Sequence, residues 1–377
     1  MSRTRMSKVG LSLTVAAVAG VTVLTGCSAT AGGDDEITVG VIMVGSENDA
    51  GYNQAVSDAA TALDAQEGVN VIKADQVAEN NSVTDTMQSM VDQGAEVIFA
   101  TSYGYHQYAV DFAKSHPDVV VMHQSGFYEG DSIPDNFGTY WSAGYELVSL
   151  GGIAAGEATE SDKIGFIYAF PVAQTIANIN AFHLGAASVN PNVTTSLVNT
   201  SDWCDPVKQK QAVASLTSQG VDVFSQHQDC QSTVIQAAKD ADAKVVGYHY
   251  DAADIAGDAW LTGSSWNWAP VMIDIVELAQ KDEFTGSEYN DNWLGMLSDG
   301  NSSLTLADFG PSVDDATKSM IEEHKASIEA GEESIFTGPI KCQDGSLLVA
   351  EGETATYADI NGFDCLVEGV VGTLPKS

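Results

Sequence analysis

The stretch VGVIMVGSENDAGYN, residues 39–53, predicts the fold class of this chain. Residues 39–43 are apolar or glycine, which is typical of a strand buried on both faces in a parallel sheet. A polar loop follows at 45–51, and the apolar residues between 55 and 63 then recur at helical spacing. These segments form one β-α unit. In open α/β sheets ligands bind beyond the carboxyl ends of the strands, so Tyr52 and Asn53 stand where a ligand is expected.

The same unit recurs along the chain. Short apolar runs predict further strands at 69–73, 95–100, 118–122, 163–168, 194–199, 221–225, 244–247 and 259–263. Amphipathic or small-residue stretches predict helices at 82–93, 106–115, 143–159, 173–189, 207–218, 233–240, 271–280 and 311–329. Strands that alternate with helices favour parallel sheets. Because the pattern restarts after the long helix at 143–159, we predict an α/β protein with two Rossmann-like lobes.

Residues 1–26 have the composition of an export signal. Basic residues precede an apolar run at 9–24, and the sequence LTGC ends at Cys27. These features are typical of a signal peptide and not of a membrane span. LTGC also resembles the lipobox of bacterial lipoproteins, which implies cleavage after residue 26 and lipidation of Cys27. The alternative is an ordinary signal peptide with a chance cysteine. Residues 27–36 then form a tether, and the body lies on the extracytoplasmic face of the cell membrane.

Charge and cysteine content limit the possible ligands and predict disulfides. The chain has 15 Lys+Arg against 52 Asp+Glu, a formal net charge of −37, which argues against nucleic acid as a partner and disfavours an acidic ligand. Four cysteines follow Cys27, and an even number in an exported protein suggests two disulfides. Nearest-neighbour pairing gives Cys204–Cys230 and Cys342–Cys365, among three possible connectivities. No CxxC spacing supports a metal site in their place.

The residues at the predicted strand ends are mostly aromatic or amide side chains. The candidate ligand-binding residues are Tyr52, Asn53, Tyr103, Gln124, Phe170, Trp203, Asp229, Asp251 and Trp266. Such a lining suits a flat, largely neutral ligand with hydrogen-bonding edges, and a nucleobase is the natural candidate. For stacking we favour Tyr52 together with Phe170 or Trp203; Asn53, Gln124, Asp229 and Asp251 would contact the ligand's rim or a sugar. The alternative is that each aromatic merely fills the base of a loop.

Motifs for catalysis are missing from the sequence. It contains no GxSxG, no HExxH and no Gly-Lys-Ser/Thr phosphate loop, and the first β-α turn lacks GxGxxG. His227, Asp229 and His249 are the least implausible metal ligands, but neutral histidines serve equally well as hydrogen-bond partners. We therefore predict a binding protein without a metal or cofactor.

Several longer segments resemble one protein family. They are KIGFIYAFPVAQTIANINAFHLGAASVNPNV (163–193), VDVFSQHQD (221–229), HYDAAD (249–254), LTGSSWNWAP (261–270), TGPIKCQDG (337–345) and EGVVGTLP (368–375). These segments are similar to the basic membrane protein (BMP) family of ABC-transporter substrate-binding lipoproteins. The resemblance implies a periplasmic-binding-protein type I architecture with a hinged cleft, a purine base or nucleoside as ligand, and an ABC permease and ATPase as partners.

Details of the resemblance bear on the ligand. DAGYN at 49–53 is similar to the family's Asp-x-Ser/Gly-Phe-Asn element, which supplies a stacking aromatic. Nucleoside-binding relatives carry a ribose-gripping lysine where this chain has Trp266, so the resemblance favours a free, adenine-like base. The family usually has Phe and Ser at the positions of Cys204 and Cys230, and the joint departure supports a disulfide between them.

The combined prediction is a lipid-anchored receptor that captures a purine for an ABC importer by lobe closure. Lobe 1 comprises residues 37–140 and about 253–300, lobe 2 comprises 141–252, and 301–377 pack near the hinge and lobes. Three alternatives stay open: a sugar-binding protein of the same fold, a ligand sensor, and an extracellular nucleoside hydrolase.

Overall fold

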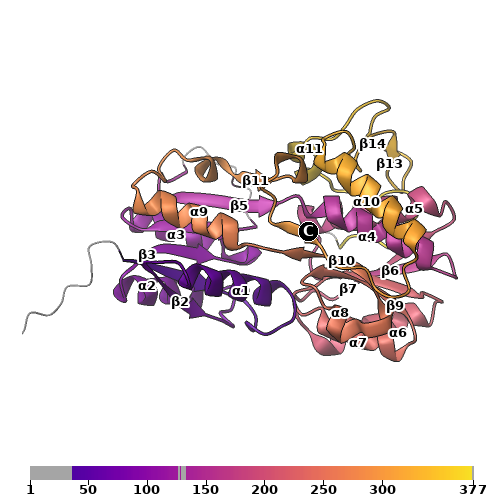
Figure 1. The fold of residues 1–377 in the computed structure, drawn as a ribbon, viewed down its shortest axis with the longest axis horizontal. Helices are drawn as coiled ribbons and strands as arrows, with labels where there is room; N and C mark the ends of the chain where they lie inside the picture. The colour runs from indigo at the N-terminus through magenta and orange to yellow at the C-terminus, as the bar shows by residue number, and fades with distance from the viewer. Residues whose placement is uncertain (1–35, 126–127, 129–132, 376–377) are drawn as a thin grey trace, which may run out of the picture. The chain divides into compact units, whose positions relative to one another are not determined.

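A six-stranded parallel sheet organises the first part of the chain (Figure 1). The computed structural model describes residues 36–125, 128 and 133–375. The strands stand in the order β11-β5-β4-β3-β1-β2, with bounds β1 Ile37–Ile42, β2 Val69–Ala74, β3 Ala95–Ala100, β4 Val120–Gln124, β5 Phe137–Ser142 and β11 Trp293–Gly295. The helices that accompany it are α1 Tyr52–Asp64, α2 Ser82–Asp92, α3 His106–Ser115 and α9 Ala269–Gln280. Strands β1 and β3 are almost fully buried, as the apolar runs in the sequence predict.

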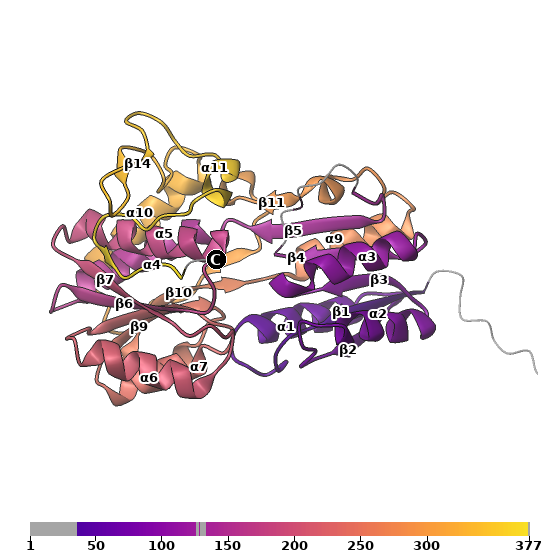
Figure 2. The same cartoon turned by 180° about the vertical axis from the view of Figure 1, so that it is seen from behind.

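A second sheet of seven strands has the order β12-β10-β9-β8-β6-β7-β15. Its strands are β6 Lys163–Tyr168, β7 Thr194–Asn199, β8 Val223–His227, β9 Lys244–His249, β10 Trp260–Trp266, β12 Leu304–Leu306 and β15 Val370–Val371. Only β12 runs antiparallel to its neighbour among these described strands. The helices around it are α4 Gly144–Ala158, α5 Ala173–Val189, α6 Pro206–Thr217 and α7 Ser232–Asp240 (Figure 2), with α8 Ala253–Ala256 (Figure 1).

The C-terminal part of the chain packs on the second sheet. Helix α10 (Asp315–Glu329) contacts α4, and α11 (Tyr357–Asn361) contacts α5. The short strands β13 (Ile340–Lys341) and β14 (Leu347–Val349) form a separate antiparallel pair, and the disulfide Cys342–Cys365 ties this hairpin to the segment before β15. The extension therefore belongs with the second sheet.

Three segments connect the two sheets, and they are hydrogen-bonded to one another. The N–H of Ala143 donates to the carbonyl oxygen of Gly295 at 3.0 Å, and the N–H of Asn267 donates to that of Ser303 at 2.7 Å. The N–H of Ser303 also donates to Ser142 Oγ at 3.0 Å. These hydrogen bonds hold the three connections together between the two sheets.

Some predicted boundaries need correction. We assigned residues 260–266 to lobe 1, but β10 pairs in parallel with β9 and therefore belongs to the second sheet. The chain returns to the first sheet only at α9, which packs on α1, and at β11. Strand β4 extends to Gln124, two residues beyond the predicted end. The sequence pattern also missed β5, whose six residues are all buried.

The predicted signal peptide, Cys27 and most of the tether lie outside the described residues. Between residues 36 and 375, in the parts that the structure describes, no helix is both long and apolar enough to cross a membrane.

Candidate ligand-binding site

A cavity lies at the carboxyl ends of the strands, between the two sheets. Its empty space, counted together with the solvent at its open mouth, is about 300 Å³. The lining side chains come from both halves of the protein: Tyr52, Ser102, Tyr103, Ser125, Trp141, Gln174, Trp203, His227, Asp229 and His249. We call this the inner cavity. Parallel strands bring their ends together at one edge, which explains why residues far apart in sequence meet here.

The first wall of the inner cavity is Tyr52, at the start of α1. Its hydroxyl accepts a hydrogen bond from Gln124 Nε2 at 2.8 Å, and Gln124 Oε1 in turn accepts one from the Tyr140 hydroxyl at 2.7 Å. Burial raises the pKa of Tyr52 well above its usual value, so the phenol is neutral. Gln124 is fully buried and does not line the cavity. The structure thus places Gln124 behind Tyr52, where it orients the ring.

Asn53 connects the side chains of Asp49 and Asp229 beside the inner cavity. Its Nδ2 donates to Asp49 Oδ2 at 2.8 Å and to Asp229 Oδ2 at 3.4 Å. Burial raises the pKa of Asp229 well above its usual value, and the nearby Asp49 carboxylate raises it further. Asn53 does not line the cavity, because its amide is engaged with these carboxylates and with the N–H of Gly45. Only Asp229 of this group faces the enclosed space.

Trp203 forms the opposite wall, on the loop after β7. The disulfide Cys204–Cys230, one of the two predicted pairs, directly follows Trp203 at one end and Asp229 at the other. Phe170 packs edge-on against Trp203, with ring centroids 4.9 Å apart and planes at 68°. Phe170 lines a wider surface hollow beyond Trp203 and not the inner cavity. Of the two candidates for the second wall, Trp203 is therefore the one that faces the enclosed space.

Two buried histidines complete the polar lining. Asn178 Nδ2 donates to His227 Nδ1 at 3.2 Å, and Trp266 Nε1 donates to His249 Nδ1 at 2.8 Å. Burial lowers the pKa of His227 to about 3 and that of His249 well below its usual value, so both rings are neutral. Trp266 itself does not line the cavity. Among the described residues, no group of three His, Cys, Asp or Glu side chains could hold a metal ion.

The remaining predicted residues fall in different places. Tyr103 lines the inner cavity and is half exposed. Asp251 is exposed, and its Oδ1 accepts a hydrogen bond from the N–H of Ala253 at the start of α8 (3.0 Å). The structure therefore gives Asp251 a helix-capping contact and places it outside the cavity lining.

Sequence reasoning missed part of the lining. Trp141 was overlooked because the strand that carries it, β5, was not predicted. The β5 sequence FGTYWS is rich in side chains that favour strands, namely aromatic residues and the β-branched Thr, and this signal could have identified the strand. Gln174 is the second residue of α5, and Ser125 directly follows β4. Both lie near the carboxyl ends of the strands, where the topology predicts a ligand. Their side chains are small or common, so the sequence did not mark them as ligand-binding residues.

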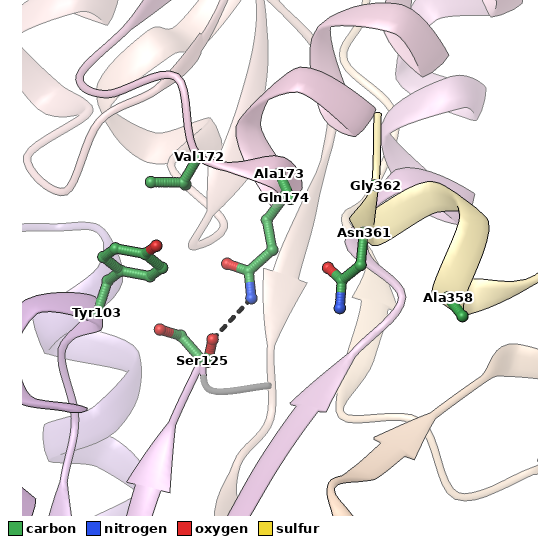
Figure 3. Close-up of a pocket in the computed structure, with 8 residues that line it drawn as sticks. All are labelled: Tyr103, Ser125, Val172, Ala173, Gln174, Ala358, Asn361 and Gly362. Carbon is green, nitrogen blue, oxygen red and sulfur yellow. Dashed lines mark hydrogen bonds between the residues drawn. The ribbon is translucent and has the colours of Figure 1, made fainter. Parts of the chain in front are cut away.

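A second, open cavity adjoins the inner one (Figure 3). Its empty space, counted together with the solvent at its mouth, is about 850 Å³. The lining residues are Tyr103, Ser125, Val172, Ala173, Gln174, Ala358, Asn361 and Gly362. We call this the outer cavity. The two cavities share Tyr103, Ser125 and Gln174, and Gln174 Nε2 donates to the carbonyl oxygen of Ser125 at 2.9 Å, the dashed line in Figure 3. This hydrogen bond connects the two halves of the protein at the boundary between the cavities.

Comparison with known proteins places this architecture in a family. A family model described as ABC transporter substrate-binding protein PnrA-like matches residues 36–307. The chain belongs to this family, Bmp. A purine-binding protein of Brucella abortus (strain 2308) is 33% identical, over 91% of this chain and 95% of its own length. A putative ABC transporter glucose-binding protein of Haloferax volcanii is 29% identical, over 87% of this chain and 78% of its own length.

Solved structures confirm the predicted fold class. An ABC transporter solute-binding protein from Aeropyrum pernix K1 matches with a TM-score of 0.67 at 16% identity, covering 81% of this chain and 93% of that one. The periplasmic-binding-protein type I architecture is therefore shown. As a Bmp-family protein, the chain is a substrate-binding protein of an ABC transporter. It works with a permease and an ATPase, and it takes up a small molecule outside the cytoplasm.

Proposed function

We propose that this protein captures a purine base for an ABC importer, and that the hydrogen-bonding edge of this base resembles that of adenine. The observation that carries the proposal is the composition of the inner cavity, where the rings of Tyr52, Trp141 and Trp203 meet two neutral imidazoles. Aromatic rings bind the faces of a flat ligand, and a few fixed polar groups bind its edge. The purine-binding relative at 33% identity supports the same class of ligand.

The charge of the lining favours an uncharged purine over a nucleotide. The residues that line the inner cavity, all in the described part of the chain, include no Lys or Arg. A phosphate group would meet no cation there, and Asp229 would repel it if ionised. A nucleoside would extend its sugar towards the outer cavity, which adjoins the inner one at Tyr103, Ser125 and Gln174. A free base has no sugar to place there.

We propose lobe closure as the mechanism of capture. The two lobes are the two sheets with their helices, and the three connecting segments are the hinge. Several hydrogen bonds link the lobes directly: Tyr52 N–H to the Asp229 carbonyl at 3.1 Å, Gln231 Nε2 to the Ala50 carbonyl at 3.0 Å, and Gln174 Nε2 to the Ser125 carbonyl. A ligand held between Tyr52 and Trp203 would add contacts available only when the lobes meet, which shifts the population towards the closed state.

A sugar is the second candidate, because a relative at 29% identity is named as a putative glucose-binding protein. Stacked aromatics together with Asp229 and Gln174 could also bind a pyranose. Isothermal titration calorimetry with adenine, hypoxanthine, guanosine and glucose separates the two. We expect heat of binding with adenine and none with glucose. Absence of heat with every purine would refute the proposed ligand, and binding of glucose alone would establish the sugar alternative.

We also propose that Cys27 carries the lipid anchor, as its LTGC sequence indicates. The variant Cys27→Ala should then pass from the membrane fraction to the soluble fraction after cell disruption, and the mature wild-type protein should show the mass of attached acyl chains. Equal membrane association of both proteins would argue against the anchor.

A further inference from the structure

His249 stands at the end of β9 in a backbone conformation that few residues adopt. Its φ is +83°, in the left-handed region that disfavours side chains with a Cβ. The residue is 2% exposed, and its ring lines the inner cavity. Such conformations persist where the surrounding structure enforces them, and they cluster at ligand sites. The position is therefore built to hold this imidazole at the cavity wall.

Trp266 fixes which nitrogen of His249 carries the proton. An indole N–H can only donate, and Trp266 Nε1 lies 2.8 Å from His249 Nδ1. His249 Nδ1 must therefore be an unprotonated acceptor. Because burial keeps the ring neutral, the single ring proton must lie on Nε2. The tautomer follows from the chemistry of the indole partner.

The resulting Nε2–H has no hydrogen-bond partner among the described residues, although the atom is buried. Buried donors are almost always paired, and one that is not costs stability. The ring of His227 lies 5.3 Å away between centroids. Its Nδ1 cannot accept a hydrogen bond from His249 Nε2–H, because it already accepts one from Asn178. The His249 ring, at the wall of the inner cavity, thus carries a buried donor that has no acceptor among the described residues.

We propose that His249 determines ligand specificity by donating its Nε2–H to an unprotonated ring nitrogen of the bound purine. Trp266 is a positioning residue that holds the tautomer. This inference rests on the proposed function and sharpens it, because it requires an acceptor at one defined position on the purine edge. A ligand with a C–H at that position leaves the donor buried and unpaired.

The test changes one atom of the ligand. The affinities of adenine, 1-deazaadenine, 3-deazaadenine and 7-deazaadenine are measured by calorimetry on the wild-type protein and on His249→Phe. One of the three deaza compounds should bind the wild type at least about tenfold more weakly than adenine. His249→Phe should lose a similar factor for adenine and should no longer distinguish adenine from that compound. If His249→Phe does not fold, the series on the wild type still tests the proposal, because equal binding of adenine and all three deaza compounds would refute it.

A matched pair of tryptophan variants tests the positioning role. Trp266→Phe keeps an aromatic ring but removes the donor to His249 Nδ1. Trp268→Phe makes the same change in the ring stacked on it, 4.6 Å away, whose Nε1 has no partner among the described residues. In ¹⁵N spectra of the imidazoles, His249 should show the Nε2–H tautomer in the wild type and in Trp268→Phe, and a mixture of tautomers in Trp266→Phe. An unchanged His249 signal in Trp266→Phe would overturn the role of Trp266.

The outcomes separate this inference from the proposed function. If adenine binds and all three deaza compounds bind equally well, the donor role of His249 is wrong while purine capture stands. If no purine binds, the proposed function fails first, and the inference fails with it.

Discussion

The amide N–H of Tyr52 donates a 3.1 Å hydrogen bond to the carbonyl oxygen of Asp229. The first turn of α1 therefore meets a residue of the second sheet directly, at the edge of the inner cavity. Gly51 makes this approach possible, because a Cβ at that position would lie only 1.7 Å from the same carbonyl oxygen. Contact between the lobes at this point depends on a residue without a side chain.

Gly51→Ala should therefore prevent full closure. We expect the affinity for adenine to fall at least about tenfold, since the contacts between Tyr52 and the second lobe can no longer form. Small-angle X-ray scattering provides a second readout: the radius of gyration of the wild type should decrease when adenine is added, and that of Gly51→Ala should not. A variant that contracts and binds like the wild type would show that this contact is dispensable.

Tyr52 should contribute mainly through its ring. Removal of the ring in Tyr52→Ala should weaken adenine binding by about 1–3 kcal/mol, roughly 5- to 150-fold, the range measured for base–aromatic stacking. Tyr52→Phe is the matched control, because it keeps the ring and loses only the hydrogen bond from Gln124. Calorimetry on both variants tests the claim. Equal losses for Phe and Ala would assign the effect to the hydroxyl instead.

The disulfide Cys204–Cys230 should support binding as well as stability. It fixes Trp203 and Asp229, which precede the two cysteines and are also joined by a hydrogen bond from the Asp229 N–H to the Trp203 carbonyl at 2.9 Å. The double variant Cys204→Ser/Cys230→Ser should lose stability, about 2–4 kcal/mol, and also bind adenine more weakly.

The second disulfide offers the control for that prediction. Cys342–Cys365 lies in the C-terminal extension, and neither cysteine lines the inner or the outer cavity. Cys342→Ser/Cys365→Ser should lower the free energy of unfolding in urea and leave the affinity for adenine unchanged. If both double variants lose affinity to the same degree, the link between Cys204–Cys230 and the site is not specific.

Glu146 should make stability depend on pH. Its side chain is buried near the hinge, where Oε2 accepts a hydrogen bond from the N–H of Leu297 at 2.9 Å. Burial raises the pKa of Glu146 from 4.5 to about 7, and the charge of Asp299 adds to the rise. Between pH 4.5 and about pH 7, Glu146 therefore keeps its proton in the folded protein and releases it in the unfolded chain. The free energy of unfolding therefore falls as pH rises through this window, by about 3 kcal/mol in total.

Glu146→Gln should remove that dependence. At pH 4.5 the variant and the wild type should be similarly stable, whereas at pH 8 the variant should be more stable by about 2–3 kcal/mol. Urea unfolding at the two pH values measures the difference. A stability difference that is the same at both would contradict the raised pKa.

The local elements of this protein follow closely from its sequence. Strands β3, β6 and β7 and helices α3 and α5 have the predicted bounds. Burial on both faces of a strand leaves a continuous apolar run, and burial on one face of a helix leaves a periodic pattern, so both can be recognised from neighbours in the chain. Short edge strands such as β11 and β12 leave no such pattern. Their three residues are defined only by pairing with β5 and β10, so the chain crossings near them were misplaced.

The chemistry of the site depended on contacts that sequence spacing does not reveal. Tyr52, Trp203 and Asp229 were predicted from their places at strand ends, and each lines the inner cavity. The tautomer of His249, however, is set by a single indole N–H from another strand, and the raised pKa of Asp229 comes from burial and from a carboxylate in the other half of the chain. Strand ends and their side chains are fixed by local pattern. Burial, proton position and unpaired donors are properties of the packed surroundings, so only the tertiary structure decided them.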